Sequence, residues 1–107
     1  MREGGVRPST IDSQPGRRVL AVVAEEFATS APQILSARRD RGIILARQAL
    51  CYILREKLNW TLGEIGHFVN RDHTTVLHAV RRARFWLHHD HYFTRCLVRA
   101  AARVEVP

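Results

Sequence analysis

The sequence predicts an all-α domain, a bundle of about six helices with an embedded helix-turn-helix. Apolar residues recur at spacings of three and four along most of the chain, which is typical of amphipathic helices. No segment alternates convincingly between apolar and polar residues, and no Asn-Gly or Asp-Gly pair marks a hairpin. In the second half of the chain, a short polar turn separates two expected helices, and His, Thr and Arg residues follow it.

Length and charge limit the classes of function and partner. The chain has 107 residues and a net charge of +7, and Lys57 is the only basic residue that is not arginine or histidine. This length suits one domain, and the charge is typical of a protein that binds nucleic acid or an anionic membrane. No apolar run approaches the ~20 residues of a membrane span. The arginines are spread over several expected helices rather than along one, which disfavours a membrane-surface helix.

Composition also sets the expected domain boundaries. Residues 1–16 are rich in Gly, Ser, Pro and charge, and they are expected to form a disordered basic tail. One folded domain that contains the helix-turn-helix is then expected over residues 17–107. Cys51 and Cys96 lie in apolar-periodic segments without a CxxC spacing, so we expect buried, reduced thiols.

Three helices and a basic loop are expected in the first half of the domain. The first helix should run from Arg17 to Ala28, where apolar residues recur every four positions. Ser30 and Gln33 have the spacing of a capping box, which predicts a short helix through Leu35. The segment SARRDRG, residues 36–42, is then expected as a basic loop. The third helix should span about Ile43 to Leu58, with a buried stripe made of Ala46, Leu50, Ile53 and Leu54.

The local signals are strongest where the helix-turn-helix is expected. Thr61 and Glu64 have the T-x-x-E pattern of a capping box, and the short helix that they open should end near Val69. Asn70 tolerates the left-handed conformation of a tight turn, and Asp72 is a good N-cap for the next helix. In that fifth helix the core side carries Val76, Val80, Ala83 and Leu87, and the outer side carries Thr74, Thr75, His78, Arg81 and Arg82. A last helix over about Tyr92 to Val104 should bury Phe93, Leu97, Ala100 and Val104.

The start of the fifth helix exposes hydrogen-bonding groups that suit the edges of DNA bases. In a helix-turn-helix, the second helix enters the major groove with its N-terminal residues against the bases. Asp72 can accept a bond from cytosine, His73 can donate or accept, and the methyl groups of Thr74 and Thr75 can pack on thymine. Asp72 alone is more typical of a helix cap, but its combination with Arg71 and the outer arginines favours the reading of DNA.

Three strings carry a resemblance to a known family. RRDRGIILARQALCYILREKL, TLGEIG and RDHTTVLHAVRRAR resemble the C-terminal DNA-binding domain, domain IV, of the bacterial replication initiator DnaA. The likeness covers roughly Val19 to Arg84. It implies an all-helical fold with an embedded helix-turn-helix, similar to Trp repressor, and double-stranded DNA as the partner.

The resemblance also implies roles for individual residues. Arg39 in the basic loop would reach the minor groove, and Asp72, His73, Thr74 and Thr75 would read bases in the major groove. Contacts to the DNA backbone are expected from Arg38, Arg41, Arg47, Gln48, Arg55, Arg71, His78, Arg81 and Arg82. The sequence departs from the family pattern at two points. The turn has Val69 and a single Asn70 where the family has Phe-Gly-Gly, and Asp40 places an acid in the basic loop.

Three classes of function are weighed. The favoured one is a sequence-specific regulator of transcription without ATPase activity, since the 107 residues contain no P-loop. The alternative is replication initiation or its control at DnaA-box-like sites, as a fragment of a longer initiator. An enzyme or metal protein rests only on the HHDH string, His88 to His91, which is more typical of a solvated helix end.

No cofactor, metal or small-molecule substrate is expected, and the expected location is the nucleoid in the bacterial cytoplasm. A protein partner such as RNA polymerase and the oligomeric state stay open.

Overall fold

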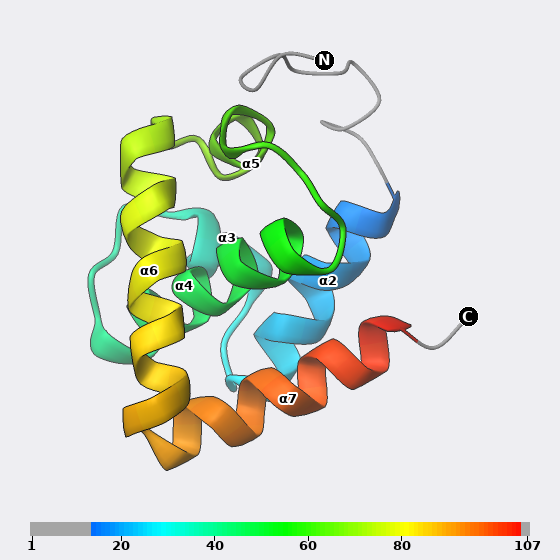
Figure 1. Ribbon diagram of the computed structural model, residues 1–107, viewed down its shortest axis with the longest axis vertical. Coiled ribbons are helices and arrows are strands. Elements are labelled where there is room, and N and C mark those ends of the chain that lie inside the picture. The colour runs from blue at the N-terminus through cyan, green and yellow to red at the C-terminus, as the bar shows by residue number, and fades with distance from the viewer. Residues whose placement is uncertain (1–13, 106–107) are drawn as a thin grey trace.

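The computed structural model describes residues 14–105, which form six helices and no strand (Figure 1). The predicted all-α class is therefore confirmed. The central helix α4 packs against each of the other five (Figure 1). In chain order the helices are α2 (Gln14–Glu26), α3 (Ala31–Leu35), α4 (Arg41–Glu56), α5 (Leu62–Val69), α6 (His73–His89) and α7 (His91–Glu105).

The first helix begins earlier than the sequence predicted. Residues 14–16, expected in the tail, belong to α2, and Gly16 is buried. Pro15 is tolerated there because the N–H groups of the first helical turn have no partner inside the helix. The rest of the expected tail, residues 1–13, lies outside the described part of the chain. At the other end, α2 stops at Glu26, and Ala28 takes the left-handed conformation with φ 56°.

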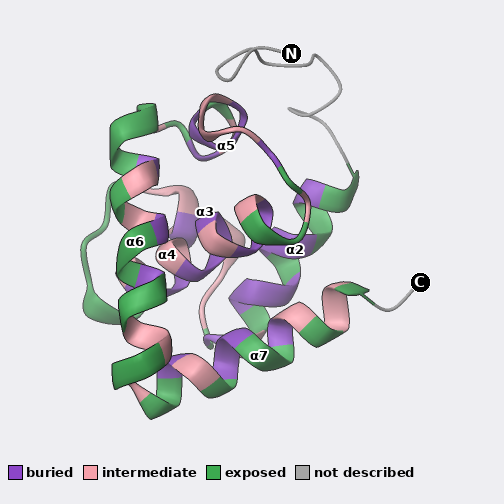
Figure 2. Ribbon diagram, viewed as in Figure 1, coloured by how far each residue is buried: buried purple, intermediate pink, exposed green. Residues whose placement is uncertain are grey.

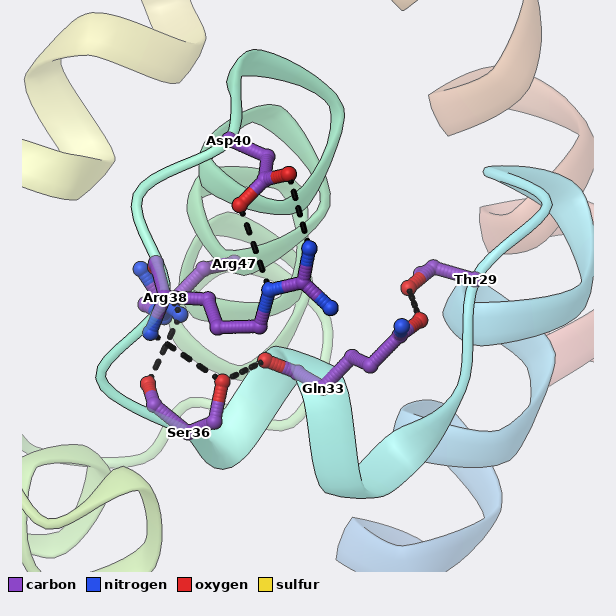
Figure 3. A network of polar contacts seen from close by, with 6 residues as sticks. All are labelled: Thr29, Gln33, Ser36, Arg38, Asp40 and Arg47. Atoms are coloured by element: carbon purple, nitrogen blue, oxygen red, sulfur yellow. Dashed lines mark hydrogen bonds and ion pairs between the residues drawn. The ribbon is translucent and has the colours of Figure 1, made fainter.

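The basic loop is shorter than expected, because α4 takes in Arg41 and Gly42. The loop therefore consists of residues 36–40. Ser30 caps α3 as predicted, with its hydroxyl accepting a bond from the Gln33 N–H at 3.3 Å. The reciprocal half of the expected capping box is replaced, since the Gln33 side chain accepts from the Thr29 hydroxyl at 2.7 Å (Figure 3).

Apolar side chains from all six helices form one core, to which α2, α4 and α7 contribute the most residues (Figure 2). The rings of Phe27 and Phe93 meet edge to face with centroids 5.7 Å apart. Both cysteines are free and buried, as predicted. Burial raises the pKa of the Cys51 thiol to about 12, so this thiol stays protonated and chemically inert at neutral pH.

The predicted helix-turn-helix is present as α5, a tight turn and α6. The Thr61–Glu64 capping box is complete, with bonds of 3.0 Å from the Glu64 N–H and 2.8 Å from the Thr61 N–H. Asn70 is left-handed, with φ 58° and ψ 50°. A Cβ on Gly66 would lie 2.4 Å from the carbonyl oxygen of Arg71. Only glycine therefore allows α5 to approach the turn this closely.

Helices α6 and α7 complete the domain. Val76, Val80 and Ala83 turn one side of α6 into the core, and the opposite side is exposed along most of the helix (Figure 2). Val104, which the sequence predicted to be buried, is only partly so because it lies in the last turn of α7. Among residues 14–105, no helix combines the length and the apolar character that a membrane span needs.

Candidate nucleic-acid interface

The start of α6 is an N-cap with an exposed polar first turn. The Oδ1 atom of Asp72 accepts a bond from the Thr75 N–H at 2.9 Å, which confirms the predicted cap. Bonds from the Thr75 and Thr74 backbone hold the pKa of Asp72 below its ordinary value, so the group is a carboxylate at neutral pH. Asp72, His73, Thr74 and Thr75 are all exposed. The contacts of these four residues with bases stay a prediction. Their side chains expose the donors and acceptors that such contacts need.

The outer side of α6 continues from this turn as a basic, aromatic surface. His78, Arg81 and Arg82 are exposed as predicted. The Arg82 guanidinium carbon lies 4.6 Å from the centroid of the Trp86 ring. Arg41, from the first turn of α4, lies 5.3 Å from the same ring. Cation–π attraction therefore gathers two predicted phosphate-binding arginines from distant parts of the sequence beside one tryptophan.

Gln48 reaches this surface through the same tryptophan. The Trp86 indole N–H donates to the Gln48 side-chain oxygen at 3.0 Å. The bond fixes the orientation of the amide and leaves its NH2 group as a donor. No pattern in the sequence indicates the bond between Trp86 and Gln48.

The acid in the basic loop pairs with one particular arginine. Arg38 donates to Asp40 from Nε at 3.2 Å and from Nη2 at 2.9 Å, so both carboxylate oxygens are engaged (Figure 3). This contact with Arg38 holds the pKa of Asp40 below its ordinary value. The same pairing explains why Asp40 precedes α4 without forming a side-chain cap. Arg39, the predicted minor-groove residue, is exposed next to this pair.

Arg47 has an internal contact set that the sequence did not predict. Its guanidinium donates to the carbonyl oxygens of Ile34 at 2.7 Å, Ser36 at 2.9 Å and Arg38 at 3.1 Å. Burial, reinforced by the charge of Arg71, lowers the pKa of Arg47 from its ordinary value. Arg47 therefore ties the basic loop to α4 (Figure 3). The expected contact of Arg47 with a DNA phosphate stays a prediction. Its guanidinium already bonds three carbonyl oxygens.

Arg71 and Arg55 also bond backbone carbonyls. Arg71 donates from Nη1 to the carbonyl oxygen of Val69 at 2.9 Å and from Nη2 to that of Ser36 at 2.7 Å. These bonds link the turn between α5 and α6, called the helix turn below, to the basic loop. Arg55 donates to the carbonyl of Trp60 at 2.9 Å and holds the connection between α4 and α5. Every residue carries a carbonyl acceptor, so no side-chain pattern could have revealed these bonds.

A groove of about 470 Å³ lies between the basic loop, α4 and α6. The groove brings together residues that are far apart in the sequence. Arg55, Asp72 and His73 are not among its lining residues, and the latter two instead border a shallower depression beside the turn. Arg38, Arg41, Thr74 and Arg81 do not line the groove either. The predicted contact residues that line the groove are Arg39, Arg47, Gln48, Arg71, Thr75, His78 and Arg82.

The HHDH string forms the junction between α6 and α7. Asp90 caps α7 by accepting from the Phe93 N–H at 2.8 Å, and its other oxygen lies 3.4 Å from Nη2 of Arg41. The His89 ring stacks on Phe85 with centroids 4.0 Å apart. Within the described range, no group of three or more His, Cys, Asp or Glu residues is placed to hold a metal ion. An Asp directly before an apolar-periodic segment is an N-cap signal, and it could have revealed this role.

Comparisons with known proteins match the part of the chain that carries this surface. The helix-turn-helix family of the bacterial dnaA protein matches residues 17–83. The chromosomal replication initiator protein DnaA of Thermomicrobium roseum is 36% identical over 105 residues, which cover 97% of this chain and 22% of the relative. The same-named proteins of Deinococcus radiodurans and Rhodopseudomonas palustris are 41% and 38% identical over 64 and 87 residues, and these matches cover 14% and 18% of them.

The chain thus spans about a fifth or less of the length of these curated relatives. The matched range includes the basic loop, α4, the helix turn and most of α6, the elements that build the interface. On the sequence match and the helix-turn-helix geometry together, this chain belongs to the bacterial DnaA helix-turn-helix family.

Proposed function

We propose that this chain binds double-stranded DNA at specific sequences, with the start of α6 in the major groove and the basic loop in the minor groove. One observation carries the proposal. The basic loop and α6 are far apart in the sequence, yet Arg39, Thr75 and Arg82 line one groove. A two-part surface of this kind can contact two neighbouring grooves of a duplex at once.

The shape and chemistry of α6 support its role in the major groove. An α-helix is about 10–12 Å across and the major groove about 12 Å wide, so the helix fits without opening the duplex. The polar residues that can address base edges lie in the first turn, the part of a reading helix that goes deepest.

Charge supports a strong electrostatic contribution to the binding. Arg39, Arg41, Arg81 and Arg82 are exposed around the groove and the outer side of α6. Each phosphate neutralised by such a group releases counterions, so the affinity should fall steeply with salt. These contacts position the domain, and base contacts from His73, Thr74 and Arg39 supply its preference for sequence.

We further propose that the preferred sequences are of the DnaA-box type and that occupying them controls replication. The support is that the relatives are named as chromosomal replication initiators and match across the whole interface. Regulation of transcription is the second candidate, because a helix-turn-helix bound within a promoter would act through the same surface. Genome-wide occupancy distinguishes the two, since sites would concentrate at an origin or at promoters. Neither role requires the chain to act as an enzyme.

Binding to labelled duplexes tests the proposal. A DnaA-box duplex and a scrambled duplex of equal composition are compared at two salt concentrations. We expect a preference for the box of about a hundredfold or more, and Thr74→Ala or His73→Ala should reduce it by about 1–3 kcal/mol. Equal binding of both duplexes by the wild-type chain would contradict recognition of the box. A randomised-site selection would then show whether another sequence is preferred.

A further inference from the structure

The carbonyl oxygen of Ser36 receives two guanidinium groups from different parts of the fold. Nη2 of Arg47, in the middle of α4, donates to it at 2.9 Å, and Nη2 of Arg71, in the helix turn, donates at 2.7 Å. A carbonyl oxygen has two lone pairs, so it can accept both. Ser36 begins the basic loop, whose residues 36–40 lie between α3 and α4 without helical structure of their own.

The other end of Arg71 is fixed in the turn. Its backbone N–H donates to the carbonyl of Gly66 at 2.9 Å. Its side chain also donates from Nη1 to Val69 at 2.9 Å and to Asn70 at 3.2 Å. One guanidinium thus spans the last residue of α5, the left-handed turn residue and the loop. The next residue along the chain, Asp72, caps α6.

We propose that Arg71 is a positioning residue that sets the basic loop, and with it Arg39, at a fixed place relative to α6. This inference rests on the proposed DNA-binding function, and it changes the role expected for Arg71 from a phosphate contact to a link between two reading elements. Specificity in the minor groove then depends on a residue of the helix turn.

The physical reason is the entropy of an exposed loop. A loop that moves freely must be ordered when it enters the minor groove, and that cost reduces the affinity and the discrimination between bases. Bonds from a charged donor to carbonyl oxygens are stronger than neutral ones and hold the loop in place before binding. The rigid fork of arginine can serve Val69 and Ser36 at the same time, whereas the single ammonium of lysine cannot hold both with the same geometry.

Arg71→Lys is the decisive variant because it keeps the positive charge and removes the two-sided link. Arg84→Lys is its matched control, since Arg84 is exposed on α6 and its guanidinium bonds Glu56 rather than the basic loop. Two further variants define the reference profiles in a randomised-site selection. Arg39→Ala marks the base pairs read through the loop, and His73→Ala marks those read by α6.

We expect Arg71→Lys to lose preference at the base pairs marked by Arg39→Ala, by roughly five- to tenfold, and to keep the preference marked by His73→Ala. Arg84→Lys should change neither profile. A uniform loss on all sequences, a loss confined to the pairs marked by His73→Ala, or an unchanged profile would each overturn the inference. Thermal unfolding of every variant is measured first. If Arg71→Lys does not fold, Arg71→Gln is put through the same selection.

A second measurement needs no DNA and separates this inference from the proposed function. Trypsin cleaves after Arg38 or Arg39 only when the loop opens, so the rate of cleavage there, identified by peptide mass, reports on the link. We expect Arg71→Lys to raise this rate several-fold above the wild type and above Arg84→Lys. An unchanged rate would overturn the link even if box recognition holds. A raised rate in a chain without sequence preference would keep the link and reject the proposed function.

Discussion

The two sides of the molecule use their basic residues in different ways. On the side formed by α2 and α7, Arg103 donates to Glu25 at 2.6 Å and to Glu26 at 3.0 Å, and Lys57 pairs with Glu105. On the reading face, defined as the basic loop and the outer side of α6, Arg38 also pairs with an acid, Asp40, but other arginines contact backbone carbonyls or aromatic rings. Arg71 bonds Ser36 there, for example, and Arg82 lies over Trp86.

The difference shows how the partners of the basic residues distribute a net charge of +7 unevenly over the surface. A carbonyl or a ring orients a guanidinium without cancelling its charge, whereas a carboxylate neutralises it. The reading face holds two acids, and both are in use, Asp40 in its pair with Arg38 and Asp72 as the cap of α6. The exposed guanidinium groups of Arg81 and Arg82 therefore keep their charge on the face where a duplex would lie.

Both sides of the molecule pack on one core, so the largest loss of stability should come from a cavity made within that core. Leu50 is fully buried in α4. Leu50→Ala should lower the free energy of unfolding by about 2–5 kcal/mol, because it leaves a cavity that the neighbouring helices cannot fill. Urea denaturation measures the loss, with Val98→Ala on the exposed side of α7 as the control. Equal stability of the two variants would show that α4 does not organise the fold.

The next largest effect should distinguish two glycines, Gly66 beside the turn between α5 and α6 and Gly42 in the first turn of α4. A Cβ at residue 66 would collide with the Arg71 carbonyl, whereas a Cβ at residue 42 has nothing within 4 Å. Gly66→Ala should cost about 1–3 kcal/mol of stability through this overlap. Gly42→Ala should stabilise the domain by about 0.5–1 kcal/mol, because alanine favours the helix. The same denaturation assay applies, and a neutral Gly66→Ala would mean that the turn relaxes easily.

A matched pair of arginines on α6 tests the charge difference directly. Arg81 is exposed on the outer side, whereas Arg84 pairs with Glu56 at 2.6 Å. Arg81→Gln should weaken binding to all sequences alike and lower the slope of log affinity against log salt by about 1. Arg84→Gln should leave that slope unchanged and cost less than about 1 kcal/mol of stability. Equal slopes for the two variants would contradict the assignment of α6's outer side to phosphate contact.

The smallest expected effect concerns the charge of the α6 cap. The cap bonds hold the pKa of Asp72 below its value in the unfolded chain. The carboxylate therefore stabilises the fold above the unfolded pKa, and this contribution disappears as the pH falls through the lowered one. Asn caps a helix as well as Asp but does not titrate. From about pH 5 to pH 2, the wild type should lose more stability than Asp72→Asn, and parallel losses would show that the ionised cap adds nothing.

Much of the fold could be predicted from the sequence, because its signals are local. The capping box of α5, the left-handed Asn70 and the cap of α6 each depend on residues within four positions of one another. The helix ends were less accurate. Ala28, which follows the end of α2 at Glu26, takes a left-handed conformation that alanine seldom adopts, and Asp90, taken as part of a histidine cluster, caps the start of α7.

The candidate site divides in the same way. The sequence by itself determined that an exposed polar turn and a row of arginines would stand on α6, since the period of a helix separates its two sides. Only the tertiary structure decided which basic side chains stay exposed and which bond backbone carbonyls inside the domain. Arg47 and Arg71 look like phosphate ligands in the sequence, and both bond the carbonyl of Ser36 in the fold. Because every residue carries that acceptor, the choice between DNA and backbone depends on distances that arise only when the helices pack.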